Sequence, residues 1–261
     1  MNRPTLVLLS TVLCGGLSLS VAARADALAS IKKAGVLRVA VPQDFPPFGS
    51  VGADLKPQGY DIDVAALLAR SFGVKLALTP VSSGNRVPFL TTGKVDLVIS
   101  SLGKNPEREK VLDFSVAYAP FYNGVFGPAN AKVPGVAALA GKTIAVTRGS
   151  VEDLELSKVA PASAVIKRFE DNNSTVSAYY SGQVQLIATG NVVAAALKKR
   201  DTEKSLETKF LIKDSPCFIG VNKNEPQLLA RVNEAIGAAR KSGALNAISL
   251  HWLNSPLPAT F

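Results

Sequence analysis

The feature that most constrains this chain is a regular alternation of short apolar segments with amphipathic ones, and it occurs twice along the sequence. The first run predicts strand, helix, strand, helix and strand at 36–42, 60–71, 74–81, 85–92 and 95–100. A second run, from 142 to 200, repeats strand and helix three times. Strands joined through a helix form parallel sheets with helices packed on them. The sequence therefore predicts an α/β fold of two lobes, each with a parallel-rich sheet flanked by helices.

Two further segments are expected to connect the lobes. The long aromatic stretch at 114–127 lies between the two runs, and the apolar strands at 210–213 and 217–221 follow the second run. We expect the first to cross from one lobe to the other and the later pair to cross back. The predicted division is lobe 1 at 26–121, lobe 2 at 122–215 and a return to lobe 1 at 216–261. Ligands of such folds bind at the carboxyl ends of strands, so the site is expected between the lobes.

The first 25 residues predict an export signal rather than part of the fold. A positive start at Asn2-Arg3 is followed by a run of apolar and small residues, and Ala23-Arg24-Ala25 matches a signal-peptidase site before Asp26. The run is short and interrupted by Ser, Thr and Gly, which disfavours a transmembrane anchor. We therefore expect a soluble periplasmic protein whose remaining cysteine, Cys217, is a small buried apolar residue.

Composition excludes several classes of function. With His251 as the single histidine and two cysteines, the chain cannot build a histidine metal cluster or a distant Ser-His-Asp triad. We expect neither a metal nor a cofactor. The net charge of +9 comes from 29 Lys+Arg against 20 Asp+Glu, but the two signs are interspersed along the chain. Without a basic helix or an aromatic-basic platform, nucleic acid is disfavoured as a partner.

Six sequence segments, in a fixed order, point to a known family. They are Phe45-Pro46-Pro47-Phe48, 59–65, 95–101, Pro106-Glu107-Arg108, 111–115, and 141–146 with Gly149-Ser150. In these segments the chain resembles the polar-amino-acid-binding proteins of ABC importers, the bacterial extracellular solute-binding proteins of family 3. The resemblance covers nearly all of the mature chain. It implies the type II periplasmic-binding-protein fold, with two hinge strands, and a monomer that captures an amino acid by lobe closure and delivers it to an inner-membrane permease.

The resemblance also implies a carboxylate-binding group. Arg108 follows Ser100 and Ser101 by one short loop, and a planar guanidinium binds a carboxylate through two parallel hydrogen bonds. In the family the matching arginine takes the ligand's α-carboxylate, with the residues matching Ser100, Ser101 and Gly103 around the ligand. A surface ion pair is the alternative for Arg108. Ser150 is expected at a helix N-terminus, where backbone N–H groups favour an anion, and it also fits an ordinary helix cap.

Three more positions match ligand contacts of the family, each with a structural alternative. Phe45 matches an aromatic residue that stacks on the ligand side chain, but it also fits a core position. Arg86 matches an arginine that meets the side-chain carboxylate in binders of acidic amino acids, and it also fits a solvent-facing helix end. Asn172 matches a polar contact in lobe 2, or a helix N-cap.

The chain departs from the family where the ligand's ammonium is bound. Many members carry an aspartate that aligns with Gly190 here, and Pro42 stands where binders of basic amino acids tend to have another. A buried ammonium without a counter-charge is costly. Three explanations are open: Asn191 or Thr189 supplies neutral acceptors, another carboxylate such as Asp171 substitutes, or the ligand has no α-ammonium. The lost acids disfavour basic ligands, and the candidate arginines favour polar or acidic ones.

An enzyme on the same scaffold is the alternative, because the family includes a branch that resembles cyclohexadienyl dehydratase. That chemistry requires a general acid or base in the cleft. His251, in the terminal helix, is poorly placed for it, whereas Glu152 and Glu170 are conceivable.

Overall fold

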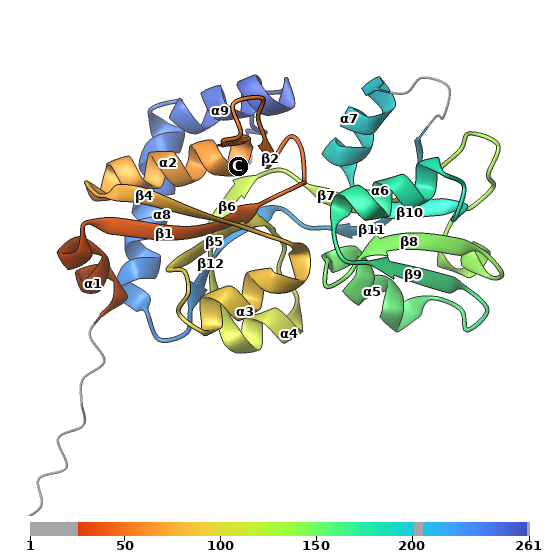
Figure 1. The fold of residues 1–261 in the computed structure, drawn as a ribbon, viewed down its shortest axis with the longest axis horizontal. Helices are drawn as coiled ribbons and strands as arrows, with labels where there is room; N and C mark the ends of the chain where they lie inside the picture. Colours follow the sequence, from red (N-terminus) through yellow and green to blue (C-terminus); the bar gives the residue numbers. More distant parts are fainter. Residues whose placement is uncertain (1–25, 201–205, 260–261) are drawn as a thin grey trace, which may run out of the picture.

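The computed structural model describes residues 26–200 and 206–259, which form two lobes side by side (Figure 1). Lobe 1 contains the strands β1 (Val36–Pro42), β4 (Lys75–Val81), β5 (Leu97–Leu102), β6 (Leu112–Ala119) and β12 (Cys217–Asn222). Lobe 2 contains β7 (Tyr122–Gly127), β8 (Thr143–Thr147), β9 (Val165–Phe169), β10 (Leu186–Gly190) and β11 (Glu207–Asp214). A small hairpin, β2 (Ser50–Val51) and β3 (Pro57–Gln58), projects from lobe 1.

Each lobe is built on one mixed five-stranded sheet. The strand order is β4-β1-β5-β12-β6 in lobe 1 and β11-β7-β10-β8-β9 in lobe 2. Parallel pairing joins β1 to β4 and β5, and β8 to β9 and β10, as the predicted strand–helix alternation requires. The strands next to the lobe crossings, β6, β7, β11 and β12, pair antiparallel. The predicted two-lobed α/β fold is confirmed, with sheets that are mixed at the crossing strands.

Helices cover both faces of the sheets. They are α1 (Ala27–Ala34), α2 (Tyr60–Phe72), α3 (Arg86–Thr91), α4 (Pro106–Val111), α5 (Val151–Val159), α6 (Asn172–Tyr180), α7 (Asn191–Arg200), α8 (Pro226–Lys241) and α9 (Ala244–Leu253). In β1, Leu37 and Val39 belong to the apolar cluster that includes α2 and α8, whereas Ala40 packs in the cluster that includes Leu90 of α3. Burial on both faces explains why β1 is apolar without a break from Val39 to Pro42.

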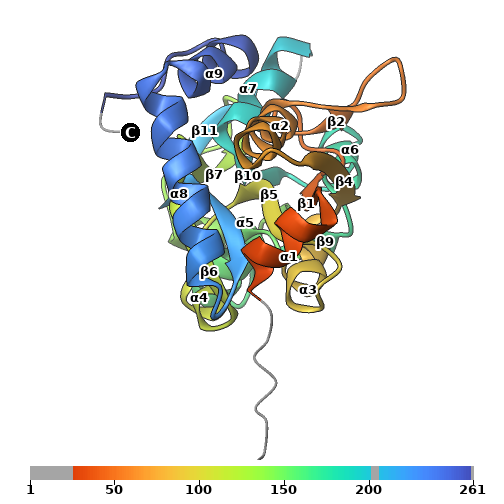
Figure 2. The same cartoon turned by 90° about the vertical axis from the view of Figure 1, so that its left-hand side faces the viewer.

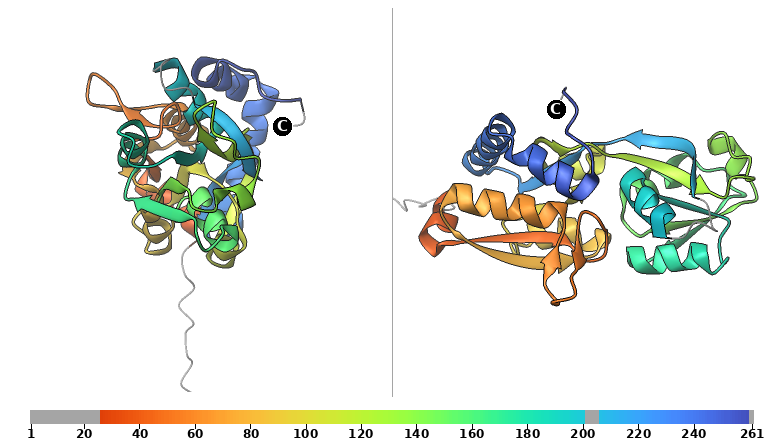
Figure 3. Two further views of the ribbon diagram at one scale, coloured as in Figure 1. Left: turned by 90° about the vertical axis from the view of Figure 1, so that its right-hand side faces the viewer. Right: turned by 90° about the horizontal axis from the view of Figure 1, so that it is seen from above.

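Two short crossings join the lobes, and we call them together the hinge. Pro120-Phe121 connects β6 to β7, and Ser215-Pro216 connects β11 to β12. The two crossings run beside each other (Figure 3, right panel), and the backbone N–H of Ser215 donates to the carbonyl of Phe121 at 3.1 Å. The single strand expected at 114–127 is therefore two strands. Proline supplies no N–H for ladder pairing, so β6 ends at Ala119, just before Pro120.

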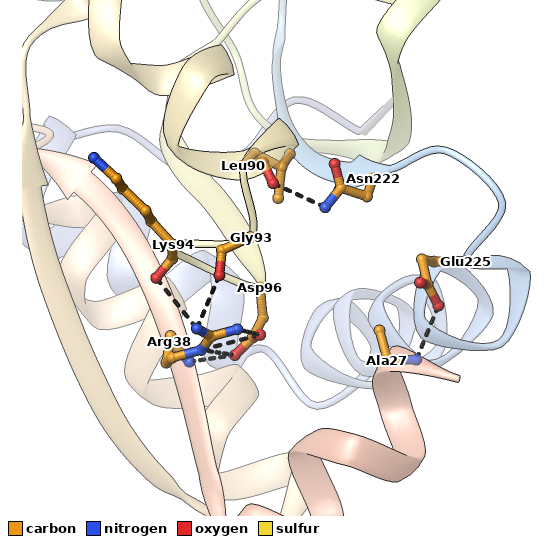
Figure 4. Close-up of polar contacts among 8 residues, drawn as sticks. All are labelled: Ala27, Arg38, Leu90, Gly93, Lys94, Asp96, Asn222 and Glu225. Carbon is orange, nitrogen blue, oxygen red and sulfur yellow. Dashed lines mark hydrogen bonds and ion pairs between the residues drawn. The ribbon is translucent and has the colours of Figure 1, made fainter. Parts of the chain in front are cut away.

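The outer end of lobe 1 is held by paired polar groups. At this end, which faces the viewer in Figure 2, the side chains of Arg38 and Asp96 form an ion pair with an N–O distance of 2.5 Å. Glu225, just before α8, accepts a hydrogen bond from the backbone N–H of Ala27 at 2.9 Å (Figure 4). This end lies at the amino ends of the parallel strands. The opposite ends, where ligands of such folds bind, face lobe 2.

The export signal expected at residues 1–25 lies outside the described residues. Within 26–200 and 206–259, no helix has the length and apolarity needed to cross a membrane. Cys217 is fully buried with a free thiol, and burial raises the pKa of that thiol well above its usual value. This environment confirms the expectation of a buried apolar residue.

Candidate ligand-binding site

Residues of both lobes line a narrow cavity between them, with an interior volume of about 20 Å³. The lining residues are Phe45, Ser83, Arg86, Ser101, Phe121, Asn123, Thr147, Ser150, Val151, Glu152, Asn172, Ala188 and Thr189. A larger hollow on lobe 2 carries only Lys132 and Lys142 as charged lining residues, and both are at least partly exposed to solvent. Buried charges and buried hydroxyl groups line the cavity between the lobes, so we place the site there.

Arg86 dominates the wall contributed by lobe 1. Its side chain is only 5% exposed, and its Nε donates to the Ser100 hydroxyl at 3.0 Å. Burial lowers the pKa of Arg86, while the nearby carboxylates of Asp61 and Glu152 act in the opposite direction. Because arginine stays charged even when buried, the cavity has a permanent cationic wall.

Ser101 presents a hydroxyl group to the same cavity. Its backbone adopts a φ of +42°, uncommon for a residue other than glycine, and its N–H donates to Asp61 Oδ2 at 2.7 Å. Asp61, in the first turn of α2, is fully buried and also accepts from the Tyr118 hydroxyl at 2.5 Å. Burial raises the pKa of Asp61 to about 7. Among the described residues, the Ser101 hydroxyl has no hydrogen-bond partner, which leaves it available to a ligand.

Polar groups at two helix starts and two strands form the wall of lobe 2. Ser150 is the N-cap of α5 and accepts from the backbone N–H of Asp153 at 3.2 Å. Two residues further on, Glu152 Oε1 accepts from Asn123 Nδ2 at 2.8 Å. Asn172, at the start of α6, accepts from the Thr147 hydroxyl at 2.8 Å. Ser150 therefore caps the helix and lines the cavity at the same time.

Hydrogen bonds across the cleft join the two lobes. Asp44 of lobe 1 accepts from Asn172 Nδ2 at 3.1 Å and from the backbone N–H of Asn173 at 2.9 Å. We call these two bonds the Asp44 clasp. Arg108 donates to the carbonyl of Gly103 at 2.8 Å and, across the cleft, to the carbonyl of Gly149 at 2.9 Å. Burial lowers the pKa of Arg108 to about 10, and the neighbouring Arg86 charge adds to this.

Phe121 explains the missing aspartate at position 190. A Cβ atom built on Gly190 would lie 2.0 Å from Cζ of the Phe121 ring, far inside carbon–carbon contact distance. The ring is itself confined by Phe48, whose centroid is 5.5 Å away, and by Phe45 at 6.2 Å. The space that an aspartate side chain would need is filled by this aromatic group.

Five of the nine predicted site residues line the cavity, namely Phe45, Arg86, Ser101, Ser150 and Asn172. The Ser100 hydroxyl accepts a hydrogen bond from Arg86, and the carbonyl of Gly103 accepts one from Arg108. A Cβ atom at Gly103 would lie 2.9 Å from Val151 Cγ2 of the other lobe, so the missing side chain permits close approach. Asn191 Oδ1 accepts from the backbone N–H of Tyr122 at 3.2 Å.

Sequence reasoning missed Asn123, Phe121 and Thr147, and it considered Glu152 only as a catalytic group. Glu152 stands two residues after Ser150, which was a candidate, so its proximity to the site could have been inferred. Asn123 and Phe121 lie in or beside crossing strands and carry no local signal. No group of three or more potential metal-ligating side chains occurs in the described part of the chain.

Comparison with known proteins places this geometry in a family. The model of the bacterial extracellular solute-binding proteins, family 3, matches residues 37–255. The chain belongs to this family. Among family 3 relatives, the L-cystine-binding protein TcyJ of Escherichia coli (strain K12) is 24% identical, with 95% of this chain and 93% of that protein covered. The glutamine-binding protein of Geobacillus stearothermophilus is 31% identical over 72% of this chain and 73% of its own.

A solved structure of another protein has a similar fold. The solute receptor for L-cysteine of Neisseria gonorrhoeae superposes with a TM-score of 0.82 at 31% identity, covering 87% of this chain and 93% of that one. The curated relatives are named as binding proteins of amino-acid transport rather than as enzymes. Family membership and these names favour a solute-binding protein over the dehydratase-like alternative.

Proposed function

We propose that this protein is the periplasmic substrate-binding component of an ABC importer that captures a free zwitterionic amino acid with a polar or acidic side chain. The lobes close on the ligand at the hinge, and the closed monomer delivers it to an inner-membrane permease. The signal peptide would direct export and be cleaved between Ala25 and Asp26. Relatives bind cystine, glutamine or arginine by name, so family membership alone leaves the side chain open.

The buried guanidinium of Arg86 is the observation that carries this proposal. Among the thirteen lining residues, Arg86 and Glu152 are the two with charged side chains. A carboxylate in the cavity would replace the water that Arg86 has lost on burial, whereas a lysine or arginine side chain would place a second cation beside it. Arg108, whose side chain is also buried, lies near enough to influence Arg86 and strengthens the preference for an anionic or neutral side chain.

Isothermal titration with the twenty L-amino acids tests the proposal. Wild-type protein is expected to bind acidic or polar amino acids and to bind lysine, arginine and histidine more weakly. Arg86→Ala should lower the affinity for acidic ligands by about 30-fold or more, because losing one partner of a buried charge pair costs ~2–5 kcal/mol of binding free energy. Neutral ligands should lose much less.

Arg70→Ala is the matched control, since Arg70 is exposed on α2 and does not line the cavity. It should bind every ligand as wild type does. Equal losses for acidic and neutral ligands in Arg86→Ala would contradict the side-chain preference. A wild-type protein that binds none of the twenty amino acids would overturn the proposed function itself.

A further inference from the structure

Hydrogen-bond acceptors gather on the lobe 2 wall of the cavity, opposite Arg86. Glu152, Asn123 and Thr189 all line the cavity, from α5, β7 and β10 respectively. Glu152 is 5% exposed and Asn123 is 2% exposed, so neither is a solvated surface group. A carboxylate in the first turn of a helix often serves the helix dipole alone, but such a group does not need to be buried in a cavity.

The orientation of the Asn123 amide follows from its partner. An ionised carboxylate can only accept hydrogen bonds, so the NH₂ group of Asn123 must face Glu152, as it does with an N–O distance of 2.8 Å. The amide oxygen, Oδ1, then has no hydrogen-bond partner among the described residues. A buried acceptor left without a donor is rare in folded proteins and indicates that an absent donor belongs there.

Other groups that were candidates for an ammonium are engaged elsewhere. Asp171 accepts from the backbone N–H of Ser174 at 2.7 Å and caps α6. Asn191 accepts from Tyr122, and Phe121 fills the space beside Gly190. Of the alternatives that the sequence leaves open, a different carboxylate in the cavity is the one that the geometry favours.

Opposite charges on the two walls also lack a direct contact. None of the ion pairs within the described ranges joins Arg86 to Glu152, although the charge of Glu152 acts on the pKa of Arg86. Two unlike buried charges that line one cavity without touching each other are complementary to a molecule that carries one charge of each sign. An amino acid with an acidic side chain presents that pair, with its side-chain carboxylate toward Arg86 of lobe 1 and its ammonium toward lobe 2.

We propose that Glu152, with Asn123 Oδ1 and the Thr189 hydroxyl, binds the α-ammonium group of the ligand and replaces the aspartate that Gly190 lacks. The three acceptors match the three N–H donors of an ammonium group. This assignment rests on the proposed function, because it requires an amino-acid ligand. It makes Glu152 a specificity-determining residue that selects 2-amino acids over the corresponding 2-hydroxy acids.

Titration of amino acids and their hydroxy counterparts tests this role. The probes are the twenty L-amino acids and, for those that bind wild-type protein, the 2-hydroxy acid with the same side chain, such as 2-hydroxyglutarate for glutamate or glycerate for serine. Wild-type protein should prefer the amino acid by about 100-fold. Glu152→Gln should lower the affinity for the amino acid by about 100-fold and leave the affinity for the hydroxy acid nearly unchanged. The preference for the amino acid should therefore fall to less than about tenfold.

The controls separate this proposal from the proposed function. Glu170→Gln removes an exposed carboxylate of lobe 2 that pairs with Arg148, and it should behave as wild type. Hydroxy-acid binding by Glu152→Gln shows that the variant cleft is folded; should that variant not fold, Asn123→Ser tests the same wall and should lower the preference about tenfold. Wild-type protein without affinity for any amino acid overturns both proposals. If Glu152→Gln, or Asn123→Ser where that variant is used, keeps the wild-type affinity for amino acids and the preference over 2-hydroxy acids, the role of Glu152 is overturned. The proposed function then stands.

Discussion

Replacing Gly190 with alanine is expected to destabilise lobe 2, because the new methyl group would overlap the Phe121 ring. The ideal Cβ position lies 2.0 Å from Cζ and 2.4 Å from Cε2 of that ring. Carbon atoms in contact are about 3.5–4.0 Å apart, so the ring would have to move by roughly 1.5 Å. Gly190 pairs with Asn123, two residues after Phe121 on the neighbouring strand, so one strand cannot shift without breaking this pairing.

The size of the effect follows from how little space surrounds the ring. Phe121 is buried and packs against Phe48 and Phe45, so it cannot swing into solvent. Overpacking a core typically costs ~1–3 kcal/mol, and the upper half of that range is expected here. For a chain of this length each kcal/mol lowers the melting temperature by about 2–4 °C, so Gly190→Ala should melt about 4–12 °C below wild type.

Thermal and urea unfolding of the ligand-free protein, followed by circular dichroism, measure this change. Gly237→Ala is the control, because Gly237 lies inside α8 and a Cβ there meets nothing within 4 Å. That variant should gain about 0.5–1 kcal/mol from the better helix propensity of alanine. The double variant Gly190→Ala/Phe121→Ala should lose less free energy of unfolding than the sum of the losses in the two single variants. An unchanged melting temperature, or strict additivity in the double variant, would refute the steric explanation for the missing aspartate.

Three further predictions concern buried charges. Because burial raises the pKa of Asp61 to about 7, the native state binds more protons than the unfolded state from about pH 4 to 7, so stability falls by up to about 4 kcal/mol as pH rises through that window. Asp61→Asn should abolish this slope in urea unfolding at pH 4.5 and 7.5, and a slope that persists would contradict it. Asp44→Ala removes the Asp44 clasp, so it should lower ligand affinity about tenfold or more. It should also enlarge the radius of gyration of the ligand-free protein in solution scattering. Unchanged affinity and radius would show that the Asp44 clasp does not hold the lobes together. Arg108→Ala should weaken acidic and neutral amino acids by similar factors in titration while the protein stays folded, and wild-type affinity would exclude Arg108 from the site.

Much of the fold could be predicted because its signals are local. From the sequence alone, two helices are predicted at about 226–241 and 244–253, where Pro226 and Gly243 mark boundaries, and the structure has α8 and α9 with these bounds. The short helix α4 was missed because its six residues carry no apolar periodicity, and only the Asn105 cap and Pro106 mark its start. Strand β11 extends beyond the expected 210–213 to Glu207–Asp214, because pairing with β7 continues through polar residues.

The site was harder to predict, because side-chain direction depends on contacts between distant segments. Both Arg86 and Arg108 are candidate ligand contacts in the sequence, yet the first lines the cavity and the second donates to backbone carbonyls. Glu152 resembles any carboxylate in a first helical turn until Asn123, 29 residues away, is placed beside it. The reason for Gly190 is likewise non-local, since it depends on the ring of Phe121.

The paired crossings of the hinge restrict how the lobes can move. A single connecting strand would let one lobe swivel about the strand axis as well as bend. Two crossings joined by the hydrogen bond between Ser215 and Phe121 resist twisting and sliding of one lobe against the other. Bending about the axis through both crossings is then the motion of lowest energy. Opening and closing then retrace one path, and Asp44 meets the start of α6 at the same position each time. The hydrogen bond between Ser215 and Phe121 thus sets how accurately the residues of the two lobes come together around the cavity.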